Sequence, residues 1–234
     1  MKRILASLSA LIFSLPFMGC MTTRQKERLL SEQIRREKNS LSMKFVVSED
    51  GILEQYNGSE AEVEVPDGIR VIGQGAFRKS LVEYVYLPDS VVEIQKDAFA
   101  DCQLLKQDVL IPESVRTLGE GIFRQCMNLE FAALESHIER VPDNMFASCT
   151  KLRTVVICHG VKHIGKSFTG CTSLEEIEIP DSVETIADFA FSGCSNLKYI
   201  TLPESVKIGR RAFYGTQIEN RAELEARYGT DIFY

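Results

Sequence analysis

Three residues in one stretch of the chain have side chains used in nucleophilic and metal chemistry. Cys158 is followed directly by His159, and His163 lies four residues further on. A cysteine beside a histidine can react as a thiolate, and two histidines four residues apart on a helix can share a metal ion. The pattern here predicts a strand end and a turn instead of a helix, and a similar stretch further on has Asp181 and Thr185 at the two histidine places. We therefore expect ordinary surface positions, with a Cys/His enzyme or metal site as a remote alternative.

Other catalytic motifs are missing from the sequence. It contains no glycine-rich phosphate loop, no serine-nucleophile elbow and no CxxC pair. His137 falls where a turn is predicted, and we expect it to be a turn residue and not a ligand. The sequence thus predicts no enzyme activity, no metal and no cofactor.

Five further cysteines occur at a fixed place, three residues after a phenylalanine: Cys102, Cys126, Cys149, Cys171 and Cys194. The same place holds Ser80 and Thr216 at the two ends of the series, so it requires a small and weakly polar side chain. An odd number of equivalent thiols cannot all form pairs. We predict buried free thiols that act as small core residues, with one disulfide between neighbours as the alternative.

The phenylalanines themselves mark a repeat. They stand 22 to 24 residues apart, at Phe77, Phe99, Phe123, Phe146, Phe168, Phe191 and Phe213. The clearest copy begins at Leu174, continues through Ile177, Ile179 and Pro180, and reaches Phe191. A single turn of this length cannot bury its own apolar face, so the copies must stack into a solenoid.

Each part of the repeat has a physical role. Apolar residues at alternate places, such as Ile177 and Ile179, predict a short strand with one buried face, and Pro180 stops that strand. The hydroxyls of a serine column, represented by Ser182, are suited to bind backbone groups where the chain turns inward. Glu135 and Cys158 replace the proline in two copies, which predicts wider turns or longer strands there.

These residues resemble the BspA-like branch of the leucine-rich-repeat family, which occurs in bacterial surface proteins. The resemblance covers about residues 45–216, including an opening Phe45-Val-Val-Ser-Glu-Asp-Gly that is similar to the family's first turn. It implies a leucine-rich-repeat solenoid of about seven 22–24-residue turns, with one stacked parallel β-sheet and a short helical or irregular far side. For some members it also implies adhesion or binding of host components.

The first 20 residues are predicted to be a lipoprotein signal peptide. Lys2 and Arg3 precede an apolar run over residues 4–18, which is too short to span a bilayer. The run ends at Gly19-Cys20, which resembles a bacterial lipobox, so Cys20 is the predicted lipidation site. An ordinary secretory peptide is the alternative. We expect a cell-envelope protein anchored by lipid, with the outer membrane favoured and the periplasmic or surface side undecided.

Two further segments flank the repeats. Residues 21–44 are basic and partly helical by pattern, which indicates a solvated tether or, alternatively, a helix resting on anionic lipid. Residues 217–234 form a predicted C-terminal cap, in which Asn220 begins a helix over residues 221–228 and Gly229 ends it.

The outward strand positions give the candidate binding residues. They form columns that present aromatic and apolar side chains in the middle turns and acids toward the ends: Tyr84, Tyr86, Leu110, Phe131, Val156, Glu176, Glu178 and Tyr199. An apolar patch rimmed by charge is typical of a binding surface. Aromatic and β-branched residues also simply favour strands, which is the structural alternative.

Charge limits the choice of partner. Residues 1–44 carry nine basic and three acidic side chains, whereas residues 45–234 carry 18 basic and 30 acidic ones. An acidic folded region repels phosphate backbones, so we expect no nucleic-acid partner. The sequence predicts a monomeric, non-catalytic module that recognises a protein or glycan. The alternative is a scaffolding lipoprotein that faces the periplasm.

Overall fold

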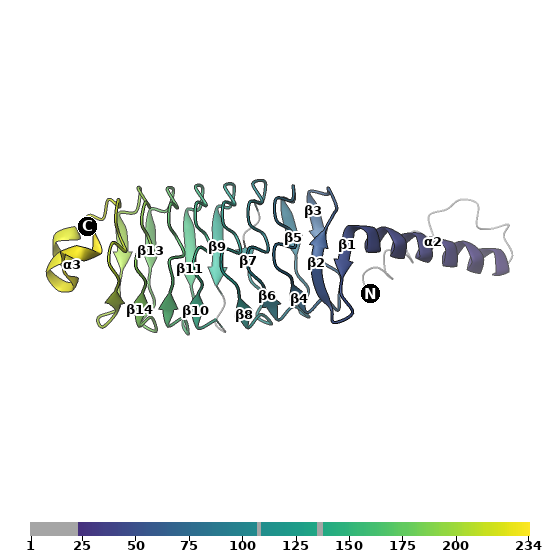
Figure 1. Ribbon diagram of the computed structural model, residues 1–234, viewed down its shortest axis with the longest axis horizontal. Coiled ribbons are helices and arrows are strands. Elements are labelled where there is room, and N and C mark those ends of the chain that lie inside the picture. Colours follow the sequence, from purple (N-terminus) through teal and green to yellow (C-terminus); the bar gives the residue numbers. More distant parts are fainter. Residues whose placement is uncertain (1–22, 107–108, 135–137) are drawn as a thin grey trace.

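The computed structural model describes residues 23–106, 109–134 and 138–234. The coils stack side by side into a rod, with α2 (Thr23–Lys44) projecting from one end and α3 (Arg221–Tyr228) covering the other (Figure 1). The predicted parallel solenoid of about seven turns is confirmed. The predicted signal peptide with Cys20, as well as His137, lies outside the described residues.

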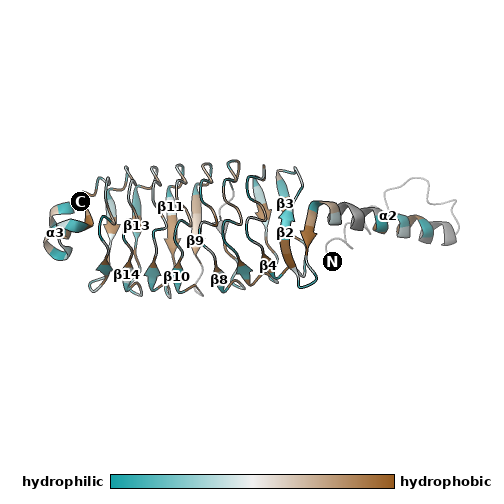
Figure 2. Cartoon of the chain, viewed as in Figure 1, coloured by the Kyte–Doolittle hydropathy of each residue, from teal (hydrophilic) through white to brown (hydrophobic). Residues whose placement is uncertain are grey.

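One side of the coils is a row of short strands, which we call the first strand row. Its members are β3 (Glu62–Glu64), β5 (Tyr84–Tyr86), β7 (Val109–Leu110), β9 (Phe131–Leu134), β11 (Thr154–Ile157), β13 (Glu176–Glu178) and β15 (Tyr199–Thr201). The middle residue of each three-residue strand is buried and its two neighbours point outward, as alternation requires. Figure 2 shows that β9 and β11 are hydrophobic and β3 hydrophilic. The row is divided into three parallel sheets, β3-β5, β7-β9-β11 and β13-β15.

β9 and β11 are four residues long, whereas the other strands of this row have two or three. They are the two strands whose following residue, Glu135 or Cys158, replaces proline. Without proline the backbone keeps a donor at that place, and the Cys158 amide donates to the Leu134 carbonyl at 3.3 Å. The prediction of longer strands is therefore confirmed.

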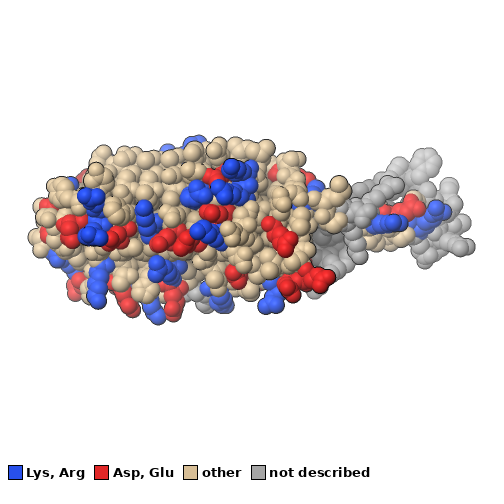
Figure 3. Space-filling view, viewed as in Figure 1, with Lys and Arg blue, Asp and Glu red and all other residues tan. Residues whose placement is uncertain are grey.

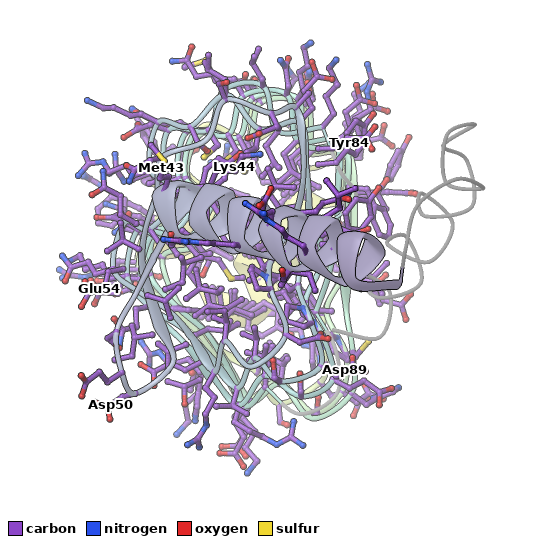
Figure 4. The ribbon with its side chains drawn as sticks, turned by 90° about the vertical axis from the view of Figure 1, so that its right-hand side faces the viewer. Met43, Lys44, Asp50, Glu54, Tyr84 and Asp89 are labelled. Carbon is purple, nitrogen blue, oxygen red and sulfur yellow. The ribbon has the colours of Figure 1, made fainter. Side chains whose placement is uncertain are left out.

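The predicted irregular side of the coil also carries a second strand row. It comprises β1 (Phe45–Val47), β2 (Ile52–Tyr56), β4 (Val71–Ile72), β6 (Glu93–Ile94), β8 (Thr117–Leu118), β10 (Arg140–Val141), β12 (His163–Ile164), β14 (Thr185–Ile186) and β16 (Lys207–Ile208). Apart from the antiparallel β1-β2 hairpin, all its pairs are parallel. Down the rod axis, Tyr84 of the first row and Glu54 of the second lie on opposite sides (Figure 4).

The repeat phenylalanines form the spine of the core. From Phe77 to Phe213, successive rings are stacked with centroids 4.9 to 5.7 Å apart. Tyr56 and Phe45 continue the stack at one end, and Phe233 continues it at the other. All these rings are buried, so one continuous apolar interior runs the length of the coils.

The second residue after each repeat phenylalanine adopts the left-handed backbone conformation. Its φ angle lies between 61° and 75° at all seven equivalent positions: Lys79, Asp101, Gln125, Ser148, Gly170, Gly193 and Gly215. Glycine accepts this conformation freely, but the other four do not. The amide of Gln125, for example, donates to the Ala147 carbonyl of the next coil at 2.8 Å, which helps to fix the strained conformation.

A small polar cluster joins α2 to the first coil. Lys44, the last residue of α2, forms an ion pair with Glu60, and the Tyr56 hydroxyl donates to Glu60 Oε2 at 2.7 Å. The hydrogen bonds from Lys44 and Tyr56 lower the pKa of the Glu60 carboxyl to about 2. The carboxylate therefore stays ionised and holds the end of α2 across the physiological range.

The C-terminal segment closes the apolar end of the stack. As predicted, α3 covers residues 221–228 and ends at Gly229 (φ 91°), although Asn220 makes no capping bond through its side chain. The chain continues through η2 (Thr230–Ile232) to Phe233, whose ring meets Phe213 at 5.9 Å. The Arg221 guanidinium lies 4.4 Å from the Phe233 ring centre, so a charged residue covers the last aromatic ring.

Within the described residues, no helix is long and apolar enough to cross a membrane.

Candidate binding face

The outer side of the first strand row places most of the predicted binding residues in solvent. Tyr86, Val156 and Tyr199 are 49%, 43% and 54% exposed. Tyr84 and Phe131 are half-buried, while Glu176 and Glu178 are exposed. Leu110 lies on β7, but its side chain is outside the described set.

These residues are distributed over the separate sheets of the first strand row. Tyr84 and Tyr86 lie on β5, beside Glu62 and Glu64 of β3. Phe131 and Val156 lie on neighbouring strands, where the small Ala133 is paired with both Leu110 and Val156. The two tyrosines of β5 therefore lie in a different sheet of the row from Phe131 and Val156.

A groove of about 500 Å³ lies over β11, β13 and β15. Four predicted residues line it: Val156, Glu176, Glu178 and Tyr199. Sequence reasoning missed four others with outward side chains: Thr154, Thr201, His159 and Asp181. Short side chains on both sides of Glu178 are the sequence signal that could have indicated a hollow, because Val156 and Thr201 occupy the corresponding places in the adjacent coils.

Tyr199 is held in place at one side of the groove. Its hydroxyl donates to Glu219 Oε1 at 2.8 Å, and this hydrogen bond raises the pKa of the Tyr199 phenol. Glu219 belongs to the segment that follows the last coil, and its amide donates to the Lys198 carbonyl at 3.1 Å. The exposed ring therefore has a fixed position without being buried.

The structure places Cys158, His159 and His163 in different parts of one coil. His163 lies in the second strand row, where its Nδ1 is 2.9 Å from the Thr185 hydroxyl in the next coil. His159 lies in the turn between the rows and lines the groove. Among the residues that the structure describes, no group of three His, Cys, Asp or Glu side chains could hold a metal ion.

The five equivalent cysteines form a buried thiol ladder. All are inaccessible to solvent and carry free thiols. Each donates to the carbonyl of the phenylalanine one coil before its own at 3.0 to 3.2 Å, as Cys149 does to Phe123. Burial raises the pKa of the Cys149 thiol to about 12 and also raises the pKa values of Cys102, Cys126 and Cys171. The ladder thus supplies packing and backbone hydrogen bonds instead of nucleophiles.

We expect these five thiols to be unreactive in the folded protein, because alkylation requires both exposure and thiolate. Treatment with iodoacetamide at pH 8, followed by mass spectrometry, should label them at least ~10-fold more slowly than in guanidinium chloride. The half-buried Cys158 is the internal comparison. Rapid labelling of Cys149 in the native protein would contradict the buried-thiol assignment.

Parallel strands stacked at intervals of 22 to 24 residues around an apolar spine define a leucine-rich-repeat solenoid. The BspA type leucine rich repeat region matches the chain in six copies, over residues 55–168 and 165–225. The chain therefore belongs to this family. Solenoids of this class are generally non-catalytic, and membership indicates a protein-interaction or surface-binding module.

Several solved structures of leucine-rich-repeat proteins are similar to the chain, including the following two. A leucine rich repeat protein of Treponema pallidum is 28% identical with a TM-score of 0.72, and the match covers 80% of this chain and 92% of that one. A leucine-rich repeat protein of Eubacterium ventriosum is 22% identical with a TM-score of 0.65, covering 74% and 48% of the two chains, and shows the shared fold alone. No curated protein matches the sequence.

Proposed function

We propose that the chain is a non-catalytic binding module of the bacterial cell envelope. It recognises a protein or glycan partner, as in adhesion, through the outer face of the first strand row. The observation that carries this proposal is the exposure of Tyr86, Val156 and Tyr199 on that face. Aromatic side chains fixed on a rigid sheet lose little conformational entropy on binding, which makes them effective anchors.

The opposite side of the coils is less suited to this role. The outward residues of the second strand row include Thr117, Arg140 and Lys207. Acidic and basic side chains are interspersed over the face seen in Figure 3, which resembles an ordinary solvated surface. The asymmetry between the two rows supports recognition through the first.

We further propose that residues 1–20 are a signal peptide and that Cys20 carries the lipid anchor. α2 then acts as a spacer, since 22 helical residues extend about 33 Å from the membrane. The run Met21-Thr22-Thr23-Arg24 lacks an acidic cluster of the kind that resembles a surface-export tag, which favours the second candidate, a scaffolding lipoprotein facing the periplasm. Protease treatment of intact cells separates the two, because only repeats outside the cell are removed.

Replacing both Tyr86 and Phe131 by serine is expected to weaken ligand capture by intact cells about tenfold or more, since two anchoring rings would be lost. The matched control is Tyr214→Ser, which removes an equally exposed tyrosine (53%) from the phenylalanine turn. Circular dichroism checks that each variant is folded. Unchanged capture by a folded double variant would remove the first strand row as the binding face.

A further inference from the structure

The groove over β11, β13 and β15 lies where the first strand row is interrupted. β11 is the edge of the three-stranded sheet, and β13 begins the next sheet. β11 is one residue longer than β13. The reason is that Cys158 follows β11 at the position where Pro180 limits β13. The groove therefore lies beside a coil in which no proline ends the strand.

The groove is lined by three carboxylates, those of Glu176, Glu178 and Asp181. No lysine or arginine is among its lining residues; Arg153 and Lys198 precede the strands and lie outside it. None of the ion pairs found in the described part of the chain includes these three acids.

Acids on other parts of the coils behave differently. Glu83 pairs with Lys106 at 2.9 Å, Glu120 with Lys96 at 3.2 Å and Glu139 with Lys162 at 3.1 Å, in each case between consecutive coils. The coils adjoining Glu176 and Glu178 instead offer Thr154, Val156, Tyr199 and Thr201 at the facing positions. The carboxylates of Glu176, Glu178 and Asp181 thus form no ion pair within the described part of the chain. A cationic group of a ligand can pair with them.

The remaining lining suits an extended chain with cationic side chains. The exposed Tyr199 ring, held by Glu219, offers a face to a guanidinium or ammonium group. The threonine hydroxyls of Thr154 and Thr201 can bond to peptide groups, and Val156 offers apolar contact. A volume of about 500 Å³ is within the range of ligand pockets and holds a few peptide residues.

We propose that this groove binds a short extended peptide segment of a partner protein that carries lysine or arginine. The inference rests on the proposed function, because it names the ligand class for one part of the same face. The carboxylates of Glu176 and Glu178 hold the cationic side chain, and Tyr199 packs against it.

The test is a titration of the full chain with acetyl-Gly-Arg-Gly-Arg-Gly-amide, with binding measured by isothermal titration calorimetry at low ionic strength. Glu176→Gln combined with Glu178→Gln should weaken binding by about five- to tenfold, as expected for loss of two partly exposed charge contacts. The matched control is Glu62→Gln with Glu64→Gln, which removes the same charges from the same strand positions of β3, outside the groove. It should change affinity less than ~2-fold. Tyr199→Ala should also weaken binding, whereas Tyr199→Phe should retain most of it.

Three outcomes would overturn the proposal. The first is equal weakening by both glutamate pairs, which indicates general attraction to an acidic protein. The second is equal binding of the peptide with glutamine in place of arginine. The third is binding of a neutral oligosaccharide, cellotetraose, with no binding of the peptide. If the peptide does not bind in the groove but Tyr86→Ser with Phe131→Ser still weakens capture by intact cells, the proposed function stands without this ligand class.

Discussion

Replacing Phe168 by alanine should lower the free energy of unfolding by about 3–5 kcal/mol, the largest effect expected from a single substitution in this chain. Phe168 is inaccessible to solvent and lies in the middle of the aromatic stack, with the rings of Phe146 and Phe191 at 5.6 and 5.1 Å. Alanine would open a cavity in contact with both neighbours. The melting temperature should fall by roughly 6–20 °C, measured by circular dichroism during heating.

Phe168→Leu is the control for this prediction. Leucine fills much of the space but cannot stack, so it should cost only about 1–1.5 kcal/mol. Because each coil contacts only its neighbours, the alanine variant should also broaden the unfolding transition by uncoupling the two halves of the stack. A loss below ~1 kcal/mol for Phe168→Ala would mean that the aromatic spine contributes far less than its burial indicates.

Replacing Gly119 by valine should cost about 3 kcal/mol through a different cause, overpacking between coils. A Cβ atom at Gly119 would lie 2.3 Å from the Lys96 amide nitrogen and 2.6 Å from the Gln95 carbonyl carbon. These are backbone atoms of the preceding coil and cannot move aside as a flexible side chain can. Denaturation in guanidinium chloride measures the loss.

Ala187 provides the matched control, because it occupies the corresponding place in another coil. Ala187→Gly removes a Cβ that this coil already accommodates, so it should cost only about 0.5–1 kcal/mol. If Gly119→Val unfolds at the same denaturant concentration as the parent protein, the coils are less closely stacked at this point than the distances indicate.

Most of the candidate face could be predicted, because strand alternation decides which side chains point outward. Tyr86, Val156, Glu178 and Tyr199 were placed correctly on the exposed side by their spacing from the proline position. The groove could not be predicted, because it depends on how far β11 and β13 separate. His159 and Asp181 also reach it from turns whose direction no periodic pattern describes.

The sequence by itself determined the coil length, the aromatic spine, the thiol ladder and the family of the fold, since each depends on a residue type that recurs at a fixed interval. Only the tertiary structure decided that the far side of the coils forms a second strand row, that the first row is interrupted beside β13, and that Glu176 and Glu178 face no cation among the described residues. The physical reason is that periodicity encodes inside and outside within one coil. Contacts between coils depend on the backbone spacing of neighbours, which the sequence of one coil does not specify.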